Sequence, residues 1–292
     1  MAINNPSNHI GIVLMVGSVI LISCSDVIAK LLAHDLAIMQ LSLIQGIVIL
    51  ISVPCIARTT RISAIVRTAH PKIQAVRSFC IFVSSVTFYT GLKYLELADV
   101  VAIIFIGPLI ITALSAVILK EKAGPRRWIA CVVGFIGALV VIRPGMSDFG
   151  WEVIFPLSAT TFYAIYVICT RKIAQRESHA TLMFYSAILG VVVLSFSAPF
   201  YWIDPNPWSW AGLLTVGILS GTSAALAICA YARAPASLLA PYAYVEILTA
   251  TLFGFLVFND LPDYYTVLGA TIIVASGLYI FRQDFRDGNS GN

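Results

Sequence analysis

The sequence predicts an all-α integral membrane protein whose ten transmembrane helices form two inverted five-helix repeats. Of the 292 residues, 59% are hydrophobic and only 11% are charged, whereas a soluble domain carries roughly 25% charged residues. The apolar residues gather in segments long enough to span a membrane. The basic residues concentrate on one side of those segments, as the positive-inside rule requires.

The first half of the chain contains five apolar segments, at about 10–32, 37–57, 72–93, 98–119 and 127–142. Each is expected to be a helix, because lipid offers no hydrogen-bond partner to an open backbone. The segments also lack the alternation of a barrel strand. Gly107 and Pro108 interrupt the fourth segment, and a proline there removes one backbone hydrogen bond and bends the helix. We expect this pair to act as a gate hinge, with a fixed kink as the alternative.

The second half contains five more segments, at about 151–170, 180–201, 209–231, 236–257 and 264–281. The stretch RPGMSDFG at 143–150 separates the halves and predicts one repeat over 1–145 and another over 146–292. Residues 94–122 align weakly with 231–260. Because each half has an odd number of spans, the repeats must be inverted in the membrane, an arrangement typical of secondary transporters.

The basic residues predict the orientation. With the N-terminus inside, fifteen lysines and arginines lie on the inner side and only Lys30, Lys93 and Arg143 on the outer side. This bias predicts a multi-pass protein of the bacterial inner membrane with both termini cytoplasmic. Gly217 and Gly221 form a G-x-x-x-G pattern, which we expect to allow close packing within the bundle rather than a dimer contact. A monomer is therefore expected.

Four charged residues fall inside the spans: Asp26, Lys30, Arg77 and Glu246. A charge at the bilayer centre costs about 2.5–3.5 kcal/mol on insertion scales, so each needs a reason. Asp26 and Lys30 are four residues apart with the acid first, which favours a local ion pair; a substrate role for Asp26 is the alternative. Arg77 either extends to the cytoplasmic headgroups or lines the inner mouth of a cavity.

Glu246 is about ten residues from either end of its span, too far for its short side chain to reach water along the lipid face. At 100° per residue it shares a helix face with Tyr242, Thr249 and Phe253. Such a face suits a small amphipathic solute, and intramembrane acids are functional candidates. A protonated or paired Glu246 that ties two helices together is the alternative.

Several aromatic residues are candidates for a stacking or cation–π surface. Tyr163 and Tyr166 lie in the sixth span, Phe82 and Tyr89 in the third, and Tyr231 in the eighth. Packing and interface anchoring are the alternatives for each, with Phe82 and Tyr163 the deepest in the membrane.

Other classes of site lack their motifs. The six cysteines are scattered singly, and the four histidines fall at span ends or in loops. No P-loop, G-x-S-x-G or H-E-x-x-H sequence occurs, and no aromatic-rich basic patch suits nucleic acid. We therefore expect no enzyme, metal, cofactor or nucleic-acid partner, but a lipid bilayer and a small solute.

Two long segments carry a resemblance. FYTGLKYLELADVVAIIFIGPLIITALSAVILKEKAGPRRWIACVVGFIGALVVIRPG (88–145) and AYARAPASLLAPYAYVEILTATLFGFLVFNDLPDYYTVLGATIIVASGLYIFR (230–282) resemble the two repeats of EamA-type permeases of the drug/metabolite transporter superfamily. The resemblance implies alternating access around a central cavity lined mainly by helices 1, 3, 4, 6, 8 and 9. It also implies export or exchange of amino acids and other small metabolites. Gln45 stands where relatives often carry an arginine.

The expected function is secondary transport of a small metabolite, with outward movement of an amino acid as the main expectation. Glu246 would titrate or bind the solute's amino group. Uptake of S-adenosylmethionine or a similar nucleoside cation is the alternative, because one branch of the resembling family is associated with that solute. A membrane-embedded enzyme or a scaffold is the remaining alternative, and neither has residues to support it.

Overall fold

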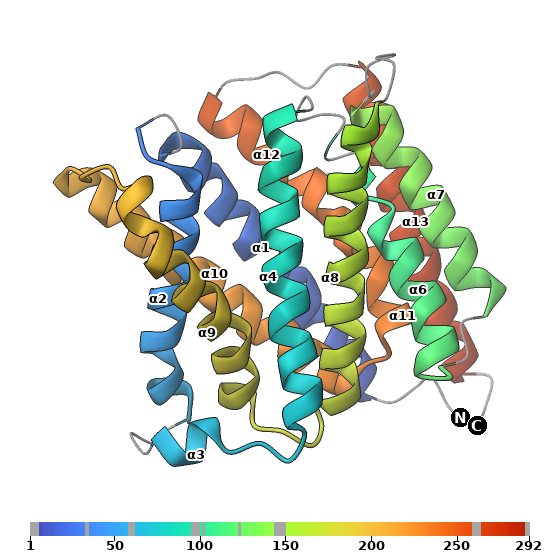
Figure 1. Ribbon diagram of the computed structural model, residues 1–292. Coiled ribbons are helices and arrows are strands. Elements are labelled where there is room, and N and C mark those ends of the chain that lie inside the picture. Colours follow the sequence, from blue (N-terminus) through green and yellow to red (C-terminus); the bar gives the residue numbers. More distant parts are fainter. Residues whose placement is uncertain are drawn as a thin grey trace.

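The computed structural model describes residues 6–32, 35–57, 62–94, 100, 103–121, 124–142, 150–258 and 264–289. Within these ranges the chain forms a bundle of helices (Figure 1). The helices of the first half are α1 (Pro6–Leu32), α2 (Ile38–Ala57), α3 (Ile62–Val66), α4 (Pro71–Tyr94), α6 (Gly107–Ile118) and α7 (Pro125–Ile142). Those of the second half are α8 (Ile154–Ile173), α9 (His179–Ser197), α10 (Pro207–Arg233), α11 (Ala236–Leu239), α12 (Val245–Phe258) and α13 (Tyr264–Asn289). Short 3-10 helices cover Trp151–Val153, Ala198–Phe200 and Ala240–Tyr244.

Each of the ten predicted segments contains a helix, so the hydropathy pattern located the helices well. By length and composition, four described helical stretches are able to cross a membrane: Ser7–Ala29, Trp151–Ile173, His179–Phe200 and Pro207–Arg233. Shorter apolar stretches occur at Met39–Pro54, Gly107–Ile118 and Val267–Ser276.

The two halves of the chain are packed into each other rather than side by side. The most extensive helix pairs each join one half to the other: α1 with α10, α4 with α8, α2 with α9, and α7 with α13. The first and last helices, α1 and α13, start and finish at the same end of the bundle (Figure 1). A polar contact ties this end together, since the Ser7 hydroxyl donates to the carbonyl of Arg233 at 3.2 Å.

The G-x-x-x-G pattern packs inside the bundle, as predicted. A Cβ added at Gly217 would lie 2.5 Å from the Cβ of Val48 on α2. A Cβ at Gly221 would lie 3.3 Å from Ile49 on the same helix. These two glycines therefore let α10 approach α2 closely.

Replacing Gly217 by alanine is expected to destabilise the protein by about 1–3 kcal/mol, because the β-branched Val48 cannot move aside without shifting α2. Gly124→Ala is the matched control, since a Cβ at Gly124 meets nothing within 4 Å. Thermal unfolding in detergent, followed by the loss of the monodisperse chromatographic peak, checks both variants. Equal melting temperatures for the two variants would contradict the tight α2–α10 contact.

Candidate functional site

Two helices are interrupted near mid-length, one in each half of the chain. In the first half, a turn at Phe105 and Ile106 precedes α6, which starts at Gly107. In the second half, the 3-10 helix Ala240–Tyr244 separates α11 from α12. A pair of broken helices at corresponding positions of two repeats is a pointer to a transporter's binding site.

At the first interruption the structure differs from the expected proline kink. Pro108 lies in the first turn of a new helix, where its missing N–H would be unbonded in any case, so the helix is broken rather than bent. Gly107 permits the close approach of α8, because a Cβ there would lie 2.6 Å from the Thr160 hydroxyl. That hydroxyl donates to the carbonyl of Ile104 at 3.1 Å and so satisfies backbone at the break.

The two interruptions contact each other through Tyr244. Its hydroxyl lies 3.1 Å from the carbonyls of Phe105 and Cys131, and its ring stacks on Phe105 with centroids 5.8 Å apart. One phenol thus fixes the end of the second break against the first. Unpaired backbone in the membrane is costly, so this bonding helps the first break to exist.

Glu246 lies in the first turn of α12, directly after the second break. A carboxylate is favoured there, since the N-terminus of a helix carries the positive end of its dipole. The sequence-based placement of Glu246 in the middle of one long helix missed this local support. The acid is half-buried, whereas Asp26 on α1 is exposed although it lies within a predicted span.

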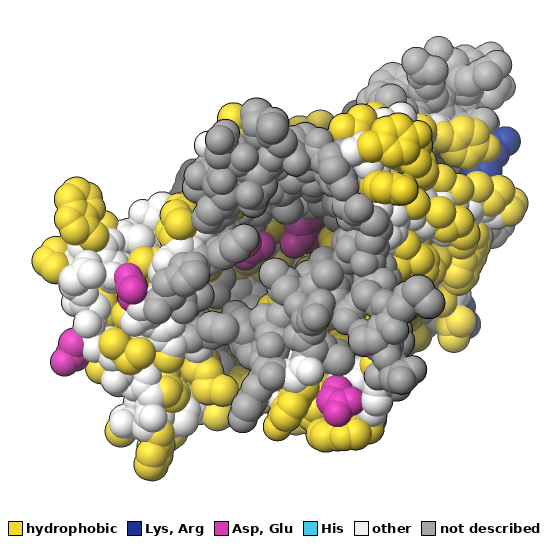
Figure 2. Space-filling model, turned by 90° about the horizontal axis from the view of Figure 1, so that it is seen from above, with side chains coloured by type: hydrophobic (Ala, Val, Ile, Leu, Met, Phe, Trp, Pro, Cys, Tyr) yellow, Lys and Arg dark blue, Asp and Glu magenta, His cyan; other side chains and the backbone are white. Residues whose placement is uncertain are grey.

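Asp26 and Glu246 lie near the contact between α1 and α12, on opposite sides of the bond that joins the two helices. The hydroxyls of Ser23 and Thr249 bond at 2.5 Å and bring these two helix faces together. Asp26 follows Ser23 by three residues and Glu246 precedes Thr249 by three, so both acids lie beside that bond. The two carboxyl groups interact electrostatically. Figure 2, seen from the end opposite the chain termini, shows a hollow with acidic side chains deep inside it.

Tyrosines from α8 and α10 adjoin the acids. Tyr163 is 40% exposed and interacts electrostatically with Glu246. Its ring centroid lies 5.9 Å from that of Tyr166, one turn farther along α8. Tyr231 on α10 is buried and interacts electrostatically with both of these tyrosines. The structure therefore places Tyr163 near Glu246 and Tyr166 beside Tyr163.

Arg77 is fully buried, which excludes the predicted extension to the cytoplasmic headgroups. Its guanidinium carbon lies 4.9 Å from the centre of the Tyr166 ring. Its donors bond to Thr170, Gln74, the carbonyl of Leu182, Tyr166 and Ser186, at 2.8–3.4 Å. Arginine has five N–H donors, so this network saturates it. Sequence reasoning missed the five partners, because four of them come from α8 and α9.

The remaining predicted residues divide into three groups. Tyr242 is buried in the core beside the second break, and Thr249 bonds α12 to α1. Phe82 on α4 is half-buried and borders Gly190 of α9. The side chains of Lys30 and Tyr89 lie outside the described residues, so the expected Asp26–Lys30 pair stays a prediction.

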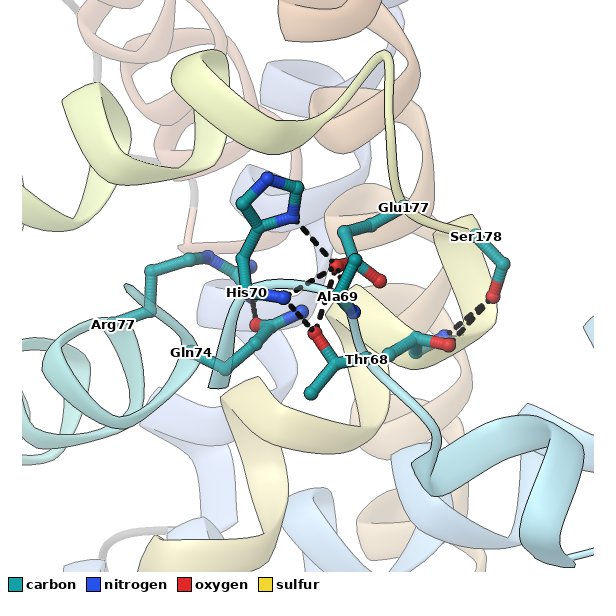
Figure 3. A network of polar contacts seen from close by, with 8 residues as sticks. Thr68, Ala69, His70, Gln74, Arg77, Glu177 and Ser178 are labelled. Atoms are coloured by element: carbon teal, nitrogen blue, oxygen red, sulfur yellow. Dashed lines mark hydrogen bonds and ion pairs between the residues drawn. The ribbon is translucent and has the colours of Figure 1, made fainter. Parts of the chain in front are cut away.

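A polar cluster around a single carboxylate lies in the loops between helices, at the end of the bundle that holds the termini. Glu177, between α8 and α9, accepts bonds from the Thr68 hydroxyl, the N–H groups of Ala69 and His70, and the His70 ring, at 2.7–3.1 Å (Figure 3). Burial alone raises the pKa of Glu177, but these four bonds outweigh it and hold the pKa below the ordinary value of 4.5. The cluster joins the segment before α4 to the second half of the chain.

A lowered pKa means that Glu177 contributes stability above its ordinary pKa and that this contribution is lost as the pH falls through the lower folded value. We expect Glu177→Gln to melt below the parent at neutral pH, and the gap to narrow as the pH falls below 4.5. Melting temperatures across a pH series check this. A gap that stays constant into acid would contradict the assignment.

Comparisons with known proteins support this architecture. The model of the EamA-like transporter family matches residues 9–143 and again residues 150–282. The chain is 30% identical over 214 residues to the S-adenosylmethionine uptake transporter of Rickettsia prowazekii, covering 73% of each chain. It is 32% identical over 181 residues to the riboflavin transporter of Vibrio cholerae, covering 62% of this chain and 61% of that one.

A crystal structure that is 15% identical superposes with a TM-score of 0.82 over 94% of this chain and 98% of the other, which shows the shared fold. The double match of the family model covers nearly all of both predicted repeats. The relatives are transporters by name and not enzymes. The chain belongs to the EamA-like transporter family.

Proposed function

We propose that this protein takes up a small organic cation, of which S-adenosylmethionine is the leading candidate, across the bacterial inner membrane. The single observation that carries the proposal is the pair of neighbouring acids Asp26 and Glu246, from opposite halves of the chain, on two helices that the Ser23–Thr249 bond joins. Two nearby carboxylates repel each other and are neutralised by one bound cation. Tyrosine faces add cation–π attraction for a sulfonium or ammonium group.

The relatives favour this alternative over the expected amino-acid export, which none of the relatives described above supports. The similarity to the Rickettsia protein supports the sulfonium compound by its name, and the similarity to the Vibrio protein makes riboflavin the natural competitor to test. Riboflavin carries no positive charge, so it leaves the two carboxylates without a counter-charge. The acid pair therefore favours the cation.

The mechanism proposed is alternating access by two inverted repeats, residues 1–145 and 146–292. The helix pairs are consistent with a pseudo-two-fold axis. Exchanging the halves turns the α1–α10 pair into the α8–α4 pair, and the α2–α9 and α7–α13 pairs into themselves. Inverted repeats place the site at mid-membrane and expose it alternately by rocking. The breaks at Gly107–Pro108 and Ala240–Tyr244 are the places where the helices would bend during rocking. The distribution of the basic residues orients the protein with both termini cytoplasmic.

Competition in proteoliposomes tests the substrate. Labelled S-adenosylmethionine would be taken up, and unlabelled S-adenosylhomocysteine, which lacks only the methyl group and the sulfonium charge, would compete at least about tenfold less well, as loss of one partly buried charge contact predicts. Equal competition by the two would overturn recognition of the sulfonium charge. Competition by riboflavin or by neutral amino acids alone would assign the protein to that solute instead.

A further inference from the structure

A polar cluster lies at the end of the bundle opposite the hollow. We name the Glu121 cluster by its residues, Ser115, Glu121, Arg171, Tyr231 and Ala236. One carboxylate oxygen of Glu121 accepts from Nε of Arg171 at 2.9 Å. The other accepts from the Ser115 hydroxyl and, at 3.1 Å, from the backbone N–H of Ala236. Arg171 also donates from Nη1 to the carbonyl of Tyr231 at 2.6 Å.

The Glu121 cluster joins the two halves of the chain. Ser115 and Glu121 belong to the end of α6 and the turn after it, whereas Arg171, Tyr231 and Ala236 lie on α8, α10 and α11. The cluster occupies the end that holds the start of α1, because α10 finishes there at Arg233, whose carbonyl binds Ser7. The acidic hollow of Figure 2 opens at the other end. Acidic side chains are thus visible from one end of the bundle, and the Glu121 cluster bonds the two halves together at the other.

The cluster is also connected to the candidate site through Tyr231 and α8. The backbone carbonyl of Tyr231 accepts from Arg171, while its side chain lies in the buried core cluster against which Tyr166 packs. Arg171 lies five residues after Tyr166 on α8, so the same helix carries site tyrosines and the cluster's cation. A shift of Tyr231 toward a bound cation would therefore pull directly on the Arg171 bond.

We propose that the Glu121 cluster is the inner latch of the transport cycle, and that it must break to release the solute, with Arg171 and Tyr231 as the coupling residues. The inference rests on the proposed alternating access but not on the identity of the solute. The Glu121 and Arg171 side chains are 15% and 16% exposed, so water can replace their partners when the halves separate. An ion pair near the surface contributes little net free energy, which suits a contact that opens in every cycle.

The test measures access from the inner side with no solute present. Ser237, next to the cluster, is fully buried and nearly isosteric with cysteine, so Ser237→Cys in a background without the native cysteines reports the opening of the latch. Inside-out vesicles are treated with a membrane-impermeant maleimide. Glu121→Gln is expected to raise the labelling rate about fivefold or more, the factor that corresponds to roughly 1 kcal/mol.

Lys172→Gln is the matched control, because Lys172 is the exposed neighbour of Arg171 and its loss should leave labelling unchanged. If the Glu121→Gln protein does not accumulate, Arg171→Lys is expected to raise the labelling rate in the same way. The lysine keeps the positive charge but cannot bond both Glu121 and the Tyr231 carbonyl. Labelling at the parent rate in whichever variant folds would overturn the latch. A wrong substrate assignment would leave this labelling pattern intact, so the two proposals fail separately.

Discussion

Glu246→Gln is expected to lower the initial rate of cation uptake about 100-fold while the protein still folds and inserts. Truncating one partner of a buried charge contact costs roughly 2–5 kcal/mol, and each 1.4 kcal/mol is a factor of ten. Glutamine keeps the shape and the hydrogen-bonding groups but removes the charge that faces the solute. The contact of Glu246 with the dipole of α12 contributes only about 0.3–1 kcal/mol, so the melting temperature should change little.

The measurement is uptake of labelled S-adenosylmethionine into proteoliposomes, with the melting temperature determined on the same preparation. Asp35→Asn is the matched control, because it removes an exposed acid just beyond α1. Asp26→Asn should reproduce the loss in Glu246→Gln in part, since Asp26 supplies the second charge of the pair. Uptake at the parent rate by Glu246→Gln would remove the acid pair from the mechanism.

The positions of the helices could be predicted from the sequence because hydropathy determines which segments partition from water into the membrane. It did not predict how two of those segments break. Pro108 and Pro241 mark possible interruptions, but a break is stable only if other helices bond the freed backbone. At the first break, Thr160 and Tyr244 do so from positions 56 and 139 residues distant from their partners, and no local pattern reveals such contacts.

The candidate site divides in the same way. Glu246 was found because a carboxylate in an apolar span is rare and costly. Its pairing with Asp26 was not found, because it depends on how α1 packs against α12. The Glu121 cluster was missed for a similar reason. From the sequence, Glu121 is an ordinary loop acid, and only the fold brings it into contact with Arg171, which lies 50 residues later.

Arg77 is where structure and sequence-based expectation differ most, and its replacement tests the difference. Arg77→Met removes a fully buried cation and leaves acceptors on α8 and α9 without a donor. Leaving a buried hydrogen-bonding group without its partner costs about 1–3 kcal/mol for each group. Since a folded protein is stable by only about 5–15 kcal/mol, we expect the yield of folded protein to fall several-fold.

Lys72→Met is the matched control for Arg77→Met, because Lys72 is an exposed cation in the first turn of the same helix. Arg77→Lys should be intermediate, since an ammonium group keeps the charge but not the fork of donors that reaches both α8 and α9. Monodisperse yield and melting temperature distinguish a structural from a substrate-binding arginine. If Arg77→Met melts like the parent and loses only uptake, Arg77 binds solute as the sequence suggested, and its saturated bonds must exchange during transport. If it melts far below Lys72→Met, the guanidinium is the internal tie that holds Tyr166 in place beside the acids.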